Sequence, residues 1–299
     1  MKLALLLITR NKVIHTAAAV TSMFMQKGEP IELLLSDSGS DDGTVAILDD
    51  MARSYNGPHK VRRLDCPCAQ APGMLGMNQH LSWAVTQTDA DVIMQLSGDD
   101  YDLAGRAQAT REAFEAHKPS MVLVSQYYVS QAMEYQGETP HATEDRWCDL
   151  LDMTQKLIGG STCQAWTQDF WHRVIKKMDC LASMDVVMPP LAVMDKGAWL
   201  VAARLHAYRK VHSEQNTGLE GVYYSFEEGD PRRAQLAELM HFQVASGWRE
   251  VIAKMDAAGL RKDEYTPILY NAFVDRAMSW VTTRIQMSLD GLPPLPFKA

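Results

Sequence analysis

The 299-residue sequence lacks an apolar stretch long enough to cross a membrane, and it lacks an excess of positive charge. A membrane-spanning helix needs about 20 apolar residues. The apolar run at the N-terminus stops at Ile8, and Arg10 and Lys12 follow at once, so it is too short for a signal peptide and indicates a first strand. The formal net charge of −8 argues against broad binding to nucleic acid or to an anionic membrane.

Cysteines are few, and their spacing does not predict a zinc site. Cys66 and Cys68 have no matching second pair, and the other three are scattered at Cys148, Cys163 and Cys180. The odd number and the scatter are typical of reduced thiols, so we expect a cytoplasmic protein. No internal repeat is present. The composition, with 46% hydrophobic and 22% charged residues, is that of a globular protein with a substantial core.

Strand and helix patterns alternate over the first 126 residues. Apolar runs typical of buried strands cover residues 3–8, 31–35, 61–64, 92–96 and 121–125. Apolar residues recur at helical spacing over residues 13–26, 45–55, 74–85 and 106–117. This alternation predicts an α/β fold with a mostly parallel sheet covered by helices on both faces.

The second half of the chain is less regular. Residues 127–158 predict an irregular insertion near a binding cleft; helices are expected over 168–178 and 185–196, and a strand over 199–205. Long helical patterns then cover 231–257 and 263–288. We expect a catalytic domain over residues 1–217 and a helical extension over 218–299, which packs on the core, acts as a lid, or forms a partner surface, including one for self-association.

Acidic turns follow two of the predicted strands. One is Asp37-Ser-Gly-Ser-Asp-Asp-Gly-Thr44, and the other is Ser97-Gly-Asp-Asp100. In open α/β sheets, ligands bind at the carboxyl ends of the strands, so these carboxylates can reach a nucleotide. Two such turns on neighbouring strands predict a site for a nucleotide and a metal, and therefore an enzyme.

The two acidic turns belong to a series of seven motifs that follow one another between residue 3 and about residue 217. In order, the seven are Thr9-Arg-Asn-Lys12, the Asp37–Thr44 turn, Gly73-Met-Leu-Gly-Met-Asn78, Leu96-Ser-Gly-Asp-Asp100, Gly159-Gly-Ser before Gln-Ala-Trp166, Met184-Asp185 and Tyr208-Arg-Lys-Val-His-Ser213. Together they resemble the family 2 glycosyltransferases with the GT-A fold. The resemblance implies transfer of a sugar, with inversion, from a nucleoside-diphosphate sugar to an acceptor hydroxyl.

The resemblance also implies a role for several residues. The donor is expected to contact Thr9, Asn11, Asp37, Asn78 and Arg209, with Arg209 neutralising phosphate charge. For the first three, a role in shaping the turns is the alternative, and for Asp37 this would be a hydrogen bond to its own turn.

A divalent cation and a base complete the expected site. Stabilising a diphosphate leaving group calls for Mn²⁺ or Mg²⁺, which prefer oxygen ligands. Asp99 is the first candidate ligand, with His212 completing the shell, and Asp185 is the candidate general base. Asp100 or Asp102 suits the cap of the helix that begins near residue 103.

Three positions depart from the family pattern. Ser97 replaces the first Asp of the DxD motif, Met77 replaces an Arg, and Met184 replaces the Glu before the base. These changes leave a degenerate nucleotide-sugar-binding module as an alternative.

The sequence also bears on two other activities. A phage-type glycosyltransferase acting on modified DNA would use a local basic surface, and its candidates are Lys60, Arg62, Arg63, Arg232 and Arg233. A nucleotidyltransferase is disfavoured because no glycine-rich phosphate loop follows the first strand. The acceptor therefore stays open among a glycan, a small molecule and modified DNA.

Overall fold

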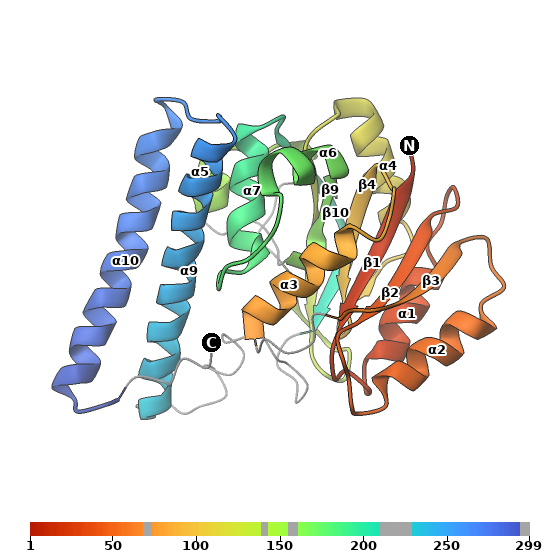
Figure 1. The fold of residues 1–299 in the computed structure, drawn as a ribbon, viewed down its shortest axis with the longest axis horizontal. Coiled ribbons are helices and arrows are strands. Elements are labelled where there is room, and N and C mark those ends of the chain that lie inside the picture. Colours follow the sequence, from red (N-terminus) through yellow and green to blue (C-terminus); the bar gives the residue numbers. More distant parts are fainter. Residues whose placement is uncertain (68–72, 139–142, 155–160, 210–228, 294–299) are drawn as a thin grey trace.

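A computed structural model of the protein describes the chain except residues 68–72, 139–142, 155–160, 210–228 and 294–299 (Figure 1). Its centre is a ten-stranded sheet. The strands are β1 (Leu3–Thr9), β2 (Glu32–Asp37), β3 (Lys60–Asp65), β4 (Val92–Ser97), β5 (Tyr101–Asp102), β6 (Met121–Val129), β7 (Tyr135–Glu138), β8 (Arg146–Trp147), β9 (Gln164–Thr167) and β10 (Ala198–Arg209).

The main strand order is β3-β2-β1-β4-β9-β6-β10-β5, with β7 beside β6 and β8 beside β10. The pairs β1–β2, β2–β3, β1–β4 and β6–β10 are parallel, and the shorter strands join them antiparallel. The predicted α/β class is confirmed. The parallel pairs bring the carboxyl ends of β1, β2 and β4 to one edge, where the site lies.

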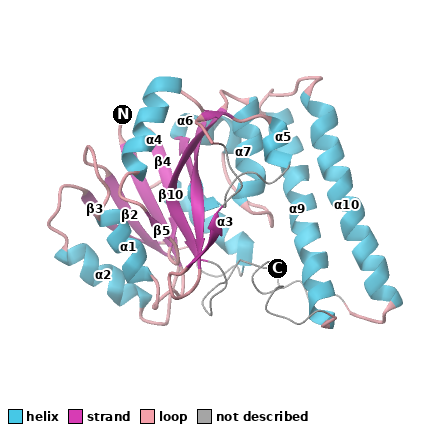
Figure 2. Cartoon of the chain, turned by 180° about the vertical axis from the view of Figure 1, so that it is seen from behind, coloured by secondary structure: helices cyan, strands magenta, loops and turns pink. Residues whose placement is uncertain are grey.

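Both faces of the sheet are covered, which explains the continuous apolar sequence of its strands. Alternate side chains of β1 belong to two separate hydrophobic clusters, one on each face. One face carries α1 (Thr16–Phe24), α2 (Thr44–Ser54) and α4 (Arg106–His117), and the other carries α3 (Gly73–Val85) and α7 (Met184–Met194). Figure 2 shows these layers from behind.

The predicted element bounds hold best where periodicity is strong. The helix expected over 106–117 matches α4 residue for residue, whereas the helix expected over 13–26 shortens to α1 because its first residues form the turn after β1. The helix expected over 168–178 is wrong beyond residue 175: α6 (Gln168–Phe170) continues as a π-helical turn over Trp171–Ile175. The irregular 127–158 segment contains the end of β6, then β7, β8 and α5 (Leu150–Thr154).

The C-terminal part folds as two long helices, α9 (Pro231–Ala257) and α10 (Tyr265–Leu289). Helix α9 begins with Asp230 as its N-cap, whose side chain accepts a hydrogen bond from the backbone of Arg232. It packs on α7 at Gly247, where an added Cβ would lie 2.7 Å from a methyl group of Val186. Glycine therefore allows the two backbones to approach closely, despite its cost inside a helix.

The helical extension shares a core with the sheet domain. Trp248, Val251 and Met255 of α9 and Leu269 of α10 belong to the same hydrophobic cluster as α7. Packing on the core is therefore observed, while the predicted division at residue 217 lies outside the described residues. Among the described residues, none of the helices combines the length and the apolar composition that a membrane-spanning segment needs.

The cysteines only partly follow the prediction of reduced thiols. Cys148, Cys163 and Cys180 are free. Cys66 is disulfide-bonded, so the prediction is wrong there, because the number and scatter of cysteines do not determine their pairing. Burial raises the pKa of Cys148 to about 12, and burial also raises the pKa of Cys163. Both thiols are therefore protonated near neutral pH, and the cytoplasmic location stays a prediction.

Candidate active site

The two acidic turns flank the turn after β1 at the carboxyl-end edge of the sheet, so their strands β2 and β4 are not neighbours, contrary to the prediction, but are separated by β1. In the parallel register, Thr9 at the end of β1 is opposite Asp37 at the end of β2. On the other side of β1, Ile8 is opposite Ser97 at the end of β4. The sheet thus brings together three segments that are far apart in the sequence, and the candidate site is built on them.

The turn after β1 is fastened to the turn after β2 through Asn11. Its backbone is in the left-handed region, with a φ of 52°, where asparagine is one of the more tolerated residues. Its N–H donates to Ser40 Oγ at 2.8 Å, and its Oδ1 accepts from the backbone of Asp41 at 3.0 Å. Asn11 therefore holds the two turns together, and its predicted contact with a nucleoside stays a prediction.

Asp37 forms the turn that follows β2. The residue is 1% exposed, and its carboxylate accepts from the backbone N–H groups of Gly39 and Ser40, both at 2.9 Å. The Ser40 hydroxyl donates a third hydrogen bond at 2.5 Å. This is the turn-shaping arrangement that the sequence left as the alternative role of Asp37.

Thr9 closely approaches Gly98 of the second acidic turn. The Thr9 side chain is 3% exposed, and its Oγ1 has no hydrogen-bond partner among the described residues. A Cβ added to Gly98 would lie 2.6 Å from the Thr9 Cβ and 3.3 Å from Lys12 Cγ. Only glycine therefore fits at position 98 without displacing the turn that carries Asp99.

Asp99 forms an ion pair with Lys12. The Lys12 Nζ lies 2.7 Å from Asp99 Oδ2, and the side chains are only 7% and 13% exposed. The Lys12 backbone N–H also donates to Thr44 Oγ1, at the start of α2, at 2.9 Å. A fixed, poorly solvated ammonium group and a carboxylate thus lie beside each other at the strand ends, where charge interactions are stronger than in water.

The neighbouring carboxylate, Asp100, points into the protein instead. It is 2% exposed and accepts from the backbone N–H of Arg209 at 2.9 Å and from Thr162 Oγ1 at 3.1 Å. Burial raises the pKa of Asp100, although its hydrogen bonds to His206 and Arg209 oppose this. Asp100 therefore fixes the turn that carries Asp99 to the interior of the protein.

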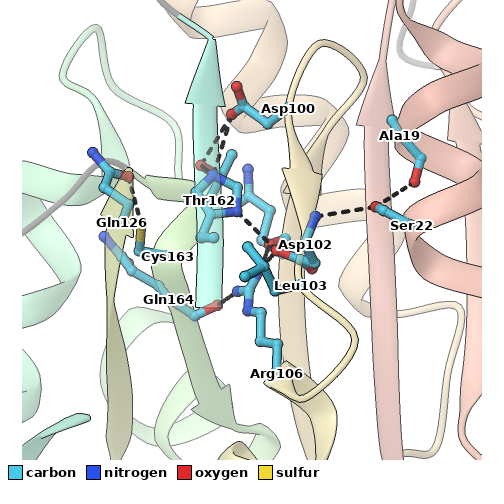
Figure 3. A network of polar contacts seen from close by, with 12 residues as sticks. Ala19, Ser22, Asp100, Asp102, Leu103, Arg106, Gln126, Thr162, Cys163 and Gln164 are labelled. Carbon is cyan, nitrogen blue, oxygen red and sulfur yellow. Dashed lines mark hydrogen bonds and ion pairs between the residues drawn. The ribbon is translucent and has the colours of Figure 1, made fainter. Parts of the chain in front are cut away.

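A buried polar network continues behind Asp100 (Figure 3). His206 Nε2 lies 2.7 Å from Thr162 Oγ1, and His206 Nδ1 lies 2.8 Å from Asp102 Oδ1. Asp102 also accepts from Arg106 at 2.6 Å. Burial lowers the pKa of His206, but the hydrogen bonds to Asp100 and Asp102 outweigh burial and raise it. The network joins β10 to the Asp99 turn.

One sequence expectation about this network is wrong. Neither Asp100 nor Asp102 caps α4, whose N-cap is Gly105 without a side-chain hydrogen bond, because both carboxylates are engaged in the network. His206 is a central member of the network, although no local sequence pattern indicates its partners. The only local signal was the spacing of Asp102 and Arg106, four residues apart.

Asn78 supports the segment that leads to Asp185. It is fully buried in α3, and its Nδ2 donates to the carbonyl oxygens of Cys180 at 2.9 Å and Ala182 at 2.8 Å. These two carbonyls lie just before α7, so Asn78 fixes the start of that helix. Its predicted direct contact with the donor stays a prediction.

Asp185 lies in the first turn of α7, where a carboxylate is favoured by the helix dipole. The helix N-cap is Ser183, which makes no side-chain cap hydrogen bond. The side chain is half-buried. Burial raises the pKa of Cys163, and the charges of Asp100, Asp102 and Asp185 add to this rise. Asp185 therefore lies within electrostatic reach of the network behind the Asp99 turn.

Arg209 is the second cation at this edge. It is 5% exposed, and its guanidinium contacts His15 Nδ1 and Met133 Sδ. Its backbone bond to Asp100 fixes the end of β10 against the turn after β4. His212, the predicted second metal ligand, lies outside the described residues.

The described residues offer limited ligands for a divalent metal. They contain no group of three or more His, Cys, Asp or Glu side chains that could hold one. Of the carboxylates that end β2 or follow β4 directly, Asp37 and Asp100 are buried and accept hydrogen bonds within the chain, whereas Asp99 is paired with Lys12 and is the candidate ligand. Mg²⁺ is commonly held by one or two carboxylates together with substrate phosphates and water. The arrangement therefore fits a metal that binds jointly with a diphosphate.

Comparison with known proteins identifies the family. The sequence pattern of Glycosyl transferase family 2 matches residues 6–165, which is just over half of the 299 residues. The chain belongs to glycosyltransferase family 2. The matched segment contains the turns after β1, β2 and β4, so this glycosyltransferase carries the family pattern where the strand ends form the candidate site. A search of curated proteins finds no match.

Solved structures similar to this glycosyltransferase include TarS of S. aureus. The crystal structure of TarS 1–349 in complex with UDP-GlcNAc has a TM-score of 0.60 and 13% identity, covering 93% of this chain and 81% of that chain. The complex with UDP has a TM-score of 0.56 and 13% identity, covering 97% and 92%. At this identity the likeness establishes the shared fold, including the C-terminal helices.

Proposed function

We propose that this glycosyltransferase takes a nucleoside-diphosphate sugar as donor and transfers the sugar to an acceptor hydroxyl with inversion. The observation that carries the proposal is the buried ion pair of Lys12 and Asp99 at the adjoining ends of β1 and β4. It provides a cation and a carboxylate at the edge where ligands of open α/β sheets bind. The TarS structures contain UDP-GlcNAc and UDP, so a UDP-sugar is the first donor to test.

The diphosphate end of the donor would lie near Asp99. Asp99, with His212 as a second ligand, would hold Mn²⁺ or Mg²⁺ together with the diphosphate, and the metal would neutralise the leaving group. Arg209 adds positive charge at the same edge. The nucleoside would contact Thr9, Asn11 and the turn that Asp37 shapes.

The base in this proposal is Asp185. An inverting transfer needs a carboxylate that removes the acceptor proton as the hydroxyl attacks the anomeric carbon. Asp185 suits this role because Asn78 fixes the start of its helix through two buried hydrogen bonds. A preorganised carboxylate does not have to be ordered again at each turnover.

The acceptor is proposed as a glycan or a small molecule. For modified DNA, four of the five candidate basic residues carry ion pairs within the chain: Lys60 and Arg62 with Glu32, Arg63 with Asp49 and Asp65, and Arg232 with Asp230. Each counter-charge reduces the positive potential available to phosphate. No observation favours this second function.

Donor turnover and product stereochemistry test the proposal. We expect release of UDP from a UDP-sugar, and a β-linked product from an α-linked donor, observed by NMR of the anomeric proton. Asp185→Asn should lower kcat by about 100-fold or more, the range for a lost general base. Asp179→Asn, an exposed carboxylate paired with Lys177, is the matched control and should retain activity. Retention of configuration, or full activity in Asp185→Asn, would refute the assigned base.

A further inference from the structure

The outer face of α10 carries an exposed apolar stripe. Its six side chains are between 40% and 76% exposed. They are Tyr270, Val274, Met278, Val281, Ile285 and Leu289. Figures 1 and 2 both show α10 at the end of the molecule, with α9 along one side and no described element along the other.

The inner face of α10 is apolar as well. Leu269 and Met287 are buried, and Trp280 donates to the buried carboxylate of Glu238 on α9 at 2.9 Å. A helix that is hydrophobic on both sides is expected to be covered on both sides. The surface of α9 accounts for one face, and the stripe on the other face needs a second partner.

The spacing of the stripe is palindromic. Its residues follow one another at steps of 4, 4, 3, 4 and 4. In an antiparallel pair of α10 helices centred between Met278 and Val281, Met278 of one copy is level with Val281 of the other copy. Val274 is then level with Ile285, and Tyr270 with Leu289. This is the self-complementarity that a two-fold interface requires, where residue i meets j and j meets i.

We propose that α10 is a dimerisation surface, which pairs antiparallel with α10 of a second copy of this chain. The stripe covers 20 residues, from Tyr270 to Leu289, and is about 28 Å long. Its side chains form two ridges spaced by four residues, and such ridges interdigitate at a crossing angle of about −50°, so Met278 and Val281 at the centre make the closest contacts. The surface comes from one helix, so the dimer is reversible and depends on protein concentration.

The charge of α10 favours a second copy over a membrane surface. Helices that lie on membranes carry Lys and Arg on their polar face. The only charged residues of α10 are Asp275, Arg276 and Arg284, and the whole chain has a net charge of −8. An anionic bilayer would therefore gain little attraction from this helix.

A pair of complementary charges tests the antiparallel register. Met278→Glu and Val281→Lys, each alone, should be monomeric in sedimentation velocity, because two-fold symmetry introduces each unpaired charge twice. We expect the dissociation constant of each to rise by at least about 100-fold. An equimolar mixture of the two should form a heterodimer, since Glu at 278 is level with Lys at 281 in the partner. The control, Gln286→Glu, lies off the stripe on the same helix and should dimerise like the wild type.

Three results would overturn the proposal. One is a wild-type chain that stays monomeric up to its solubility limit, and another is a dimer that persists in both single variants. The third is sedimentation of the wild type with anionic vesicles that Met278→Glu abolishes. Circular dichroism and UDP binding should be the same in all variants, because α10 lies at the opposite end of the molecule from β1–β3 (Figure 1).

Discussion

Replacement of Gly98 by alanine should damage the candidate site without removing any proposed ligand. The added Cβ would lie 2.6 Å from the Thr9 Cβ, whereas carbon atoms in contact lie about 3.5–4.0 Å apart. The turn after β4 must therefore move by roughly 1 Å away from β1. Because Asp99 follows directly and its ion pair with Lys12 bridges the same gap, the shift would separate these two groups.

The expected loss can be estimated from this displacement. A misplacement of about 1 Å in a catalytic site can cost about 100-fold in rate, and overpacking of a core costs about 1–3 kcal/mol of stability. We therefore expect Gly98→Ala to lower kcat/KM for sugar transfer by about 10- to 100-fold. Donor turnover at several donor concentrations and urea unfolding would measure the two effects separately.

Gly105→Ala is the matched control. Its added Cβ would lie 3.6 Å from Leu205 Cδ2, which is an ordinary contact, and Gly105 precedes α4 on the same segment of chain. Its activity should stay within about twofold of the wild type, because substitutions of this kind change stability by about 0.5 kcal/mol. If Gly98→Ala were as active as this control, the geometric account of the Asp99 turn would be refuted.

Three further substitutions test the buried contacts. Asn78→Ala should lower the free energy of unfolding by about 2–4 kcal/mol, because two carbonyl oxygens lose their hydrogen-bond donor. It should also lower kcat, because Asp185 is less well fixed. Urea unfolding measures the first effect and donor turnover the second. Burial lowers the pKa of His206, but its bonds to two carboxylates outweigh burial and raise it. The wild type should therefore lose stability as the pH rises above about 6.5 and through this raised pKa. His206→Gln should lack that loss when unfolding curves are measured across pH. Arg106→Met should cost about 3–5 kcal/mol in unfolding free energy, measured by urea unfolding, because it removes the cation of a buried ion pair with Asp102 and the donor to two buried carbonyl oxygens.

Local sequence patterns predict the parts of the fold that depend on local periodicity. The strand β1 and the helix α4 were both predicted because their apolar side chains repeat at the periods of a buried strand and an amphipathic helix. The antiparallel position of β9 between β4 and β6 was not predicted. That position depends on pairing between segments far apart in the sequence, which periodicity does not encode.

The same contrast between local patterns and long-range contacts applies to the candidate site. The acidic turns were predicted because their residues are contiguous and follow strands. The support of α7 by Asn78 and the contact of His206 with Asp102 were not, since each joins residues more than 100 positions apart. The close approach of Gly98 to Thr9 was not predicted either, because it depends on how two neighbouring strands pack side by side.

Nucleotide binding at the strand ends is the most direct test of the account. Thermal unfolding would be followed with UDP, GDP, dTDP and CDP, each with and without Mn²⁺, for the wild type and Asp99→Ala. A ligand at 100 times its Kd stabilises the folded state by about 2.7 kcal/mol. We predict stabilisation by one nucleoside diphosphate, strengthened by Mn²⁺ and lost in Asp99→Ala. No stabilisation of the wild type by any of the four would contradict a donor site at this edge of the sheet.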